Sequence, residues 1–180
     1  FTKLSKEHIR NKLISALPTT STEGSLSLEV LAFQRILKSN MRGMTVKDFI
    51  AEIPELFQRL APCVLMSPIT VAQYLKAEPD LFDLVVFDEA SQLPTSEAIG
   101  SLARAKSAVI VGDPKQLPPT SFFSSGYVDE ENLDTEDLES ILDDCLALGI
   151  PEKHLNWHYR SKHESLIAFS NIMYYGNRLC

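Results

Sequence analysis

The spacing of apolar residues changes along the chain. In residues 1–17, 25–39 and 45–60, apolar side chains recur every three or four positions, which predicts three helices. Pro54 lies inside the third segment, so we expect that helix to break or kink there. These segments predict an amino-terminal helical region over residues 1–62.

Shorter apolar runs follow at residues 63–66, 84–87 and 108–111, without helical spacing. Their length, composition and polar flanks are typical of buried strands. Residues 97–105 are long enough for a helix that crosses between the last two strands, and such a crossover joins parallel strands. We therefore predict an α/β fold with a parallel sheet and flanking helices.

The remaining segments predict a helix at 138–148, a strand at 154–159 and a helix at 161–171. We expect residues 63–150 to belong to one domain and residues 151–180 to begin a second. The three cysteines form no zinc pattern and indicate a reducing, cytoplasmic compartment. No apolar run approaches the length that spans a membrane.

The formal charge of −7 is concentrated in one segment. Residues 1–115 carry 13 basic and 13 acidic side chains, residues 116–152 carry no Lys or Arg and 10 acids, and residues 153–180 carry 4 basic side chains and 1 acid. Because the rest of the chain is balanced, the net charge does not exclude binding to a phosphate backbone. We expect the acidic segment to lie away from any nucleic acid.

Acidic residues follow the two strands that the crossover helix joins. Asp88 and Glu89 end one strand, and Asp113, Lys115 and Gln116 follow the other. In an open parallel sheet, ligands bind at the carboxyl ends of the strands. Such a set suits a divalent metal bound to phosphate. Considered without other motifs, the alternative of solvated acids at strand ends stays open.

Three motifs extend this pattern into a resemblance to superfamily 1 helicases. Asp-Glu-Ala-Ser at 88–91 resembles their Walker B element (motif II), and Gly-Asp-Pro-Lys-Gln-Leu-Pro-Pro at 112–119 resembles motif III. Trp-His-Tyr-Arg-Ser at 157–161 resembles the Tyr-Arg motif that opens the second RecA-like domain. The resemblance covers residues 63–179 and is closest to the RNA-surveillance-type branch and to large bacterial AAA/helicase-like proteins with extra domains.

The resemblance implies a partial RecA-like sheet of the P-loop NTPase type. It also implies ATP and Mg²⁺ as cofactors, bound between two RecA-like domains, with hydrolysis driving movement along a single nucleic-acid strand. DNA is favoured over RNA as the partner, although the residues themselves encode no choice. The helical region over 1–62 is either a cover for the sheet or an accessory subdomain of the kind that this family often carries.

The resemblance also assigns roles to residues of the first RecA-like domain. Asp88 would hold Mg²⁺, and Glu89 would orient the attacking water. Gln116 would contact the γ-phosphate, while Asp113 would orient either the metal shell or the loop. Gln116 could otherwise be an ordinary turn residue.

In the second domain, Tyr159 would stack on the adenine and Arg160 would act as an arginine finger. Alone, these residues would indicate a core tyrosine and a surface ion pair. His158 stands where relatives often carry Asn or Gln, which leaves hydrogen bonding to the adenine open.

The remaining assignments concern nucleic acid. Ser67, Pro68 and Thr70 would touch the backbone, and Pro118 would connect the loop to the nucleic acid. A helix-capping turn is an equally good explanation of residues 67–70.

The chain carries no P-loop, since none of its seven glycines begins Gly, four residues, then Gly-Lys-Ser/Thr. We expect the P-loop to lie upstream in a larger parent protein, and the isolated 180 residues to be inactive. The alternative is an ATPase-inactive helicase-like module used for partner binding. Without the P-loop strand, the edge of the strand at 108–111 would need a cover, and we expect the amino-terminal helices, the carboxyl-terminal segment or a second copy of the chain to supply it.

Overall fold

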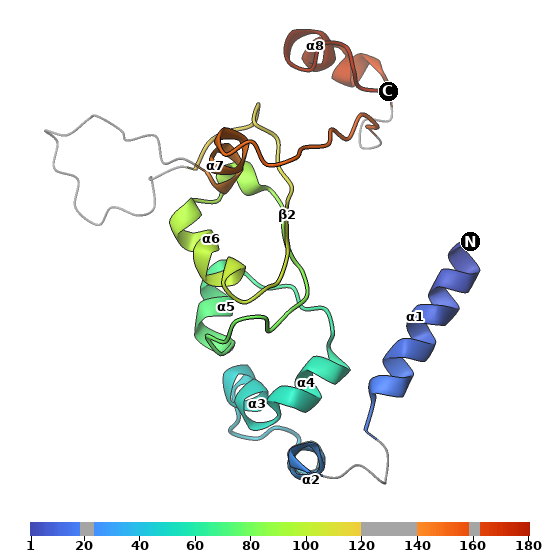
Figure 1. Ribbon diagram of the computed structural model, residues 1–180, viewed down its shortest axis with the longest axis vertical. Coiled ribbons are helices and arrows are strands. Elements are labelled where there is room, and N and C mark those ends of the chain that lie inside the picture. The colour runs from blue at the N-terminus through green and yellow to red at the C-terminus, as the bar shows by residue number, and fades with distance from the viewer. Residues whose placement is uncertain (19–23, 120–139, 159–162) are drawn as a thin grey trace, which may run out of the picture. The chain divides into compact units, whose positions relative to one another are not determined.

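The computed structural model describes residues 1–18, 24–119, 140–158 and 163–180 (Figure 1). The protein has a mixed α/β fold, as predicted, and its chain divides into two compact units, Phe1–Pro79 and Asp80–Cys180. Each unit has its own apolar cluster.

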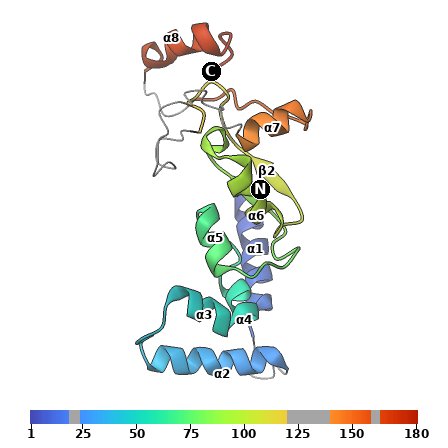
Figure 2. The same ribbon diagram turned by 90° about the vertical axis from the view of Figure 1, so that its left-hand side faces the viewer.

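The described part of the first unit is helical. Pro54 separates two helices and takes the first helical position of the second, where its missing N–H costs nothing. Glu29 caps that second helix by accepting the Leu56 N–H at 2.7 Å. Figure 2 shows α2 lying along one side of α3 and α4, and α2 packs against α4. The bounds are α1 (Thr2–Ala16), α2 (Ser25–Lys38), α3 (Val46–Glu52), α4 (Pro54–Leu60) and α5 (Pro68–Tyr74).

The prediction of a strand at residues 63–66 is wrong. These residues form no strand, and the side chain of Leu65 is 97% exposed. A short apolar run becomes a strand only where a neighbouring strand pairs with it, and the described residues supply none at this point.

The second unit contains a two-stranded parallel sheet, β1 (Val85–Phe87) and β2 (Ala108–Ile110). Val86 pairs with Val109. The connection runs through a 3₁₀ turn, η1 (Ala90–Gln92), and a helix, α6 (Thr95–Leu102), which confirms the predicted crossover. The last helices are α7 (Ile141–Ala147) and α8 (Ser165–Tyr174).

One face of the sheet is buried and the other is open. Phe87 packs with apolar residues of η1, α6 and α7 in a single cluster. On the opposite face, Leu84, Val86 and Val109 are 50%, 56% and 45% exposed. The prediction of buried strands is therefore confirmed for one face only. Parallel sheets normally carry helices on both faces, and the described residues leave these three side chains uncovered.

The carboxyl-terminal segment departs from the prediction in part. Residues 154–158 form no strand, and the rest of the strand predicted at 154–159 lies outside the described residues. Two backbone hydrogen bonds join this segment to the end of the chain, from the Cys180 N–H to Asn156 and from the His158 N–H to Cys180. The helix predicted at 161–171 is confirmed as α8, which begins and ends later. Within the described helices, no stretch is both long and apolar enough to cross a membrane.

Candidate functional site

The candidate site begins where β1 and β2 end side by side. The Val111 N–H donates to the carbonyl oxygen of Phe87 at 2.8 Å, and the Ala90 N–H donates to that of Val111 at 2.9 Å. Backbone pairing thus continues beyond both strands. Because the strands are parallel, residues 88–89 and residues 112–113 leave the sheet at the same edge.

Gly112 permits the close approach of the two strand ends. A Cβ atom at this position would lie 2.9 Å from the backbone nitrogen of Ser91, 3.2 Å from that of Ala90 and 3.0 Å from Cδ2 of Leu142. Backbone atoms cannot rotate away as a side chain can. Packing against η1 and α7 therefore requires glycine here.

The side chains of Asp88 and Glu89 are exposed at the end of β1. Asp88 Oδ1 accepts the Glu89 N–H at 3.1 Å. Glu89 has φ 54° and ψ 40°, a left-handed backbone conformation that is uncommon and strained for glutamate. Among the described residues, neither Asp88 Oδ2 nor the Glu89 carboxylate has a side-chain hydrogen bond or ion pair, so both can meet a ligand.

Asp88 and Glu89 suit a magnesium ion better than a metal that is bound entirely by protein side chains. The described part of the chain contains no group of three or more His, Cys, Asp or Glu side chains placed to hold a metal. Magnesium in nucleotide sites is usually bound through one or two carboxylates, water and substrate phosphate. Asp88, an exposed oxygen donor at a strand end, fits that mode of binding.

Asp113 forms a turn and uses both of its carboxylate oxygens within the protein. The Gln116 N–H donates to the Asp113 carbonyl at 3.1 Å, and Pro114 occupies the second position, as is common in such turns. Oδ1 accepts the Lys115 N–H at 2.9 Å, and Oδ2 accepts the Tyr175 hydroxyl at 2.5 Å. The hydrogen bond to Asp113 raises the pKa of Tyr175 to about 12.

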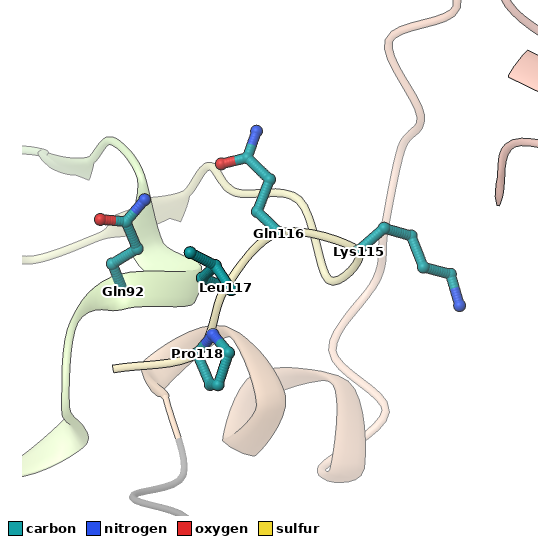
Figure 3. A pocket seen from close by; sticks show the side chains of 5 residues that line it. All are labelled: Gln92, Lys115, Gln116, Leu117 and Pro118. Atoms are coloured by element: carbon teal, nitrogen blue, oxygen red, sulfur yellow. The ribbon is translucent and has the colours of Figure 1, made fainter. Parts of the chain in front are cut away.

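A pocket of about 370 Å³ lies on the loop after β2 (Figure 3). Gln92 and Gln116 extend in the same direction on either side of Leu117, while the Lys115 side chain points away from them. Among the residues that the structure describes, no acid lines the pocket, and its two amides can donate hydrogen bonds. The pocket can therefore accept an anionic or polar group. Its lining residues are Gln92, Lys115, Gln116, Leu117 and Pro118.

The structure brings together some of the predicted residues. Gln116 and Pro118 line the same pocket, whereas Asp88 and Glu89 leave the neighbouring strand and do not line it. Gln92 lines the pocket and was missed by the sequence analysis. Its only signal was its position immediately after the Asp-Glu-Ala-Ser motif.

The other predicted residues are not in the described part of the second unit. Ser67, Pro68 and Thr70 belong to the first unit, where the Ser67 hydroxyl caps α5 by accepting the Thr70 N–H at 3.3 Å. Tyr159 and Arg160 lie outside the described residues.

Two acids of the acidic segment have structural roles in the second unit. Asp143 and Ser140 form a capping box at the start of α7. Asp144 accepts a hydrogen bond from the Thr95 hydroxyl at the start of α6. Part of the negative charge therefore stabilises the helices that support the sheet.

Comparisons with known proteins show what parts of the chain are similar to. The family model described as an AAA domain matches residues 64–124, which include β1, α6, β2 and the loop that carries Gln116. An uncharacterized ATP-dependent helicase of Mycoplasma genitalium is 35% identical over 133 residues, covering 69% of this chain and 12% of the relative.

Two further relatives come from an archaeon and a yeast. An uncharacterized ATP-dependent helicase of Methanocaldococcus jannaschii is 29% identical over 147 residues, 77% of this chain and 20% of that protein. The DNA replication ATP-dependent helicase/nuclease dna2 of Schizosaccharomyces pombe is 33% identical over 101 residues, 55% of this chain and 7% of that protein. The chain spans only a small part of the length of each of these relatives.

Proposed function

We propose that the chain is the central part of an ATP-dependent helicase or translocase of superfamily 1, related to its RNA-surveillance-type branch. Residues 63–150 would form the later part of a first RecA-like domain, residues 151–180 would begin a second, and residues 1–62 would be an accessory segment. ATP hydrolysis between the two domains would drive movement on a single strand. The parent protein would be cytoplasmic, and DNA would be its preferred nucleic acid.

The observation that carries this proposal is the combination of exposed acids after one strand with a pocket lined by amide side chains after the neighbouring strand. Exposed carboxylates leave β1, and among the described residues the pocket on the loop after β2 is lined by two amides and a lysine but by no acid. A magnesium-bound triphosphate needs both kinds of environment, since the cation requires oxygen donors and the phosphates require hydrogen-bond donors. We expect the two adjacent strand ends to supply them.

Each residue then has a limited task. Asp88 would hold the metal through its exposed carboxylate, and Glu89 would orient the attacking water and accept its proton. Gln116 would donate its amide hydrogen to a phosphate oxygen without adding charge. Bound magnesium would neutralise charge on the transferring phosphate.

The residues outside this pair of strand ends complete the proposal. Arg160 and Tyr159 would act from the second domain on the phosphate and the adenine, respectively. Ser67, Pro68 and Thr70 would contact the nucleic-acid backbone, with Pro118 connecting the loop to it. These assignments depend on the motif resemblance.

The test is release of inorganic phosphate from ATP by the full-length protein, with and without single-stranded DNA or RNA. We expect magnesium-dependent release that a single strand stimulates and that Glu89→Gln lowers by about 100-fold or more. The isolated 180 residues should release none. Turnover by the full-length protein that Glu89→Gln leaves unchanged would contradict the assignment, and a strand-separation assay distinguishes a helicase from an ATPase that does not unwind.

The open face of the sheet supports a further property of the isolated chain, self-association. Leu84, Val86 and Val109 expose apolar surface that a second copy would remove from water. We expect sedimentation to show a concentration-dependent dimer that Val86→Lys weakens. A strictly monomeric wild-type chain would refute this part of the proposal.

A further inference from the structure

A hydrogen bond joins the loop after β2 to the segment that follows α8. The Tyr175 hydroxyl donates to Asp113 Oδ2 at 2.5 Å, although the two residues are 62 positions apart. The bond has a charged acceptor, and Tyr175 is partly buried. Hydrogen bonds to charged groups are shorter and stronger than those between neutral groups. Nothing in the motif resemblance assigns a role to Tyr175.

The position of Tyr175 is fixed from its own side by a buried amide. Asn171, which is 8% exposed, donates from Nδ2 to the Leu179 carbonyl at 3.1 Å. Its Oδ1 accepts the Leu179 N–H at 3.0 Å, and its carbonyl accepts the Asn177 N–H at 2.9 Å. Asn171 thereby folds residues 176–179 back onto α8. Tyr175 begins this turn, so its backbone is well anchored.

Asp113 connects the Tyr175 hydroxyl to the loop that lines the pocket. One of its oxygens accepts from Tyr175, and the other accepts the Lys115 N–H inside the turn. A carboxylate held at both oxygens cannot rotate without breaking one hydrogen bond. The Asp113 carbonyl also accepts the Gln116 N–H, and the Gln116 side chain lines the pocket.

We propose that Tyr175 is a positioning residue, whose hydroxyl fixes Asp113 and, through the turn, the direction of the Gln116 amide. This inference rests on the proposed function in one respect, that the pocket receives a phosphate group. It links the amide that contacts the phosphate to the segment after the Tyr-Arg motif.

The structural test uses nuclear magnetic resonance on the 180-residue chain with Tyr175→Phe. We expect the Lys115 amide hydrogen to exchange about tenfold faster and the Gln116 side-chain amide signals to shift. The matched control is Tyr174→Phe, which removes the same hydroxyl from a neighbouring side chain that is 56% exposed. It should leave both signals as in the wild type.

Asp113→Asn supplies a second variant and a double-mutant cycle. If the hydroxyl acts through Asp113, Tyr175→Phe should add nothing to Asp113→Asn in either signal. Wild-type signals in Tyr175→Phe, or effects of the two substitutions that add, would overturn the inference.

The functional test uses phosphate release by the full-length protein. Tyr175→Phe should lower kcat about tenfold and leave KM for ATP within about twofold, because a misdirected amide weakens the transition state more than substrate binding. An unchanged kcat in an active protein would overturn the positioning role. Absence of turnover in the wild type would instead refute the proposed function, while the resonance experiment still decides whether Tyr175 holds the loop.

Discussion

The two adjacent strand ends carry acidic residues and use them differently. At the end of β1, Asp88 keeps one carboxylate oxygen without a partner among the described residues, and Glu89 is exposed in a strained backbone conformation. After β2, both oxygens of Asp113 accept hydrogen bonds from the protein itself. The comparison indicates that neighbouring donors, rather than the type of residue, separate an acid available to a ligand from one that shapes a loop.

Removing each charge in turn tests this contrast most strongly. In the full-length protein, Asp88→Asn should lower ATP turnover by about 100-fold or more, because the proposed metal ligand is lost. Asp113→Asn should lower it only about tenfold, by releasing the loop. Phosphate release measures both variants, and an Asp113→Asn variant as inactive as Asp88→Asn would remove the distinction.

The contact between the strand ends is tested by adding a methyl group. Gly112→Ala should lower the free energy of unfolding by about 1–3 kcal/mol, because the new Cβ meets backbone atoms of η1. The matched control is Gly100→Ala in α6, where the nearest atom is Arg104 Nη1 at 3.7 Å. It should be neutral or stabilising by up to about 1 kcal/mol. Urea unfolding of the 180-residue chain measures the stability of both variants. Equal changes in the free energy of unfolding would contradict the close approach of Gly112 to η1.

The strained backbone at Glu89 predicts a smaller effect on stability, in which glycine is more stabilising than alanine. Glycine adopts the left-handed conformation without a Cβ penalty, so Glu89→Gly should unfold with a free energy about 1 kcal/mol higher than that of Glu89→Ala. Both variants lack the carboxylate and should be inactive. Urea unfolding compares them, and an alanine variant at least as stable as the glycine variant would show that the backbone is not strained.

The smallest expected effect concerns alkaline pH. The pKa of Tyr175 is about 12 in the folded protein, against about 10 in an unfolded chain, so the unfolded chain releases this proton first. The stabilisation is complete below about pH 10 and is lost as the pH rises towards about 12. The free energies of unfolding of the wild type and of Tyr175→Phe should therefore converge over that pH range. A difference in the free energy of unfolding that does not change with pH would rule out a contribution from the ionisation of Tyr175.

Periodicity predicted elements whose stability is local. The helix at 25–39 and the break at Pro54 follow from side-chain spacing and from a missing N–H, and both are confirmed. The run at 63–66 needed a pairing partner, which apolar character alone does not guarantee. Pairing of 84–87 with 108–111 was predictable because a helix of suitable length lies between them.

The candidate site was predictable in position but not in detail. Acids after strands indicated the edge of the sheet, and the turn at Asp113 and Pro114 follows from their usual turn positions. The bond from Tyr175 joins distant residues, and no local pattern encodes it. The role of Gln92 in the pocket was also not predictable from the sequence, since only the fold brings this residue to the loop after β2.

The missing side chain at Gly112 has a mechanical consequence. Even one added methyl group would meet the backbone nitrogens of Ser91 and Ala90 at 2.9 Å and 3.2 Å, so little free space separates the two segments. A displacement of the η1 turn towards the loop would therefore push residues 112–113 by a similar distance.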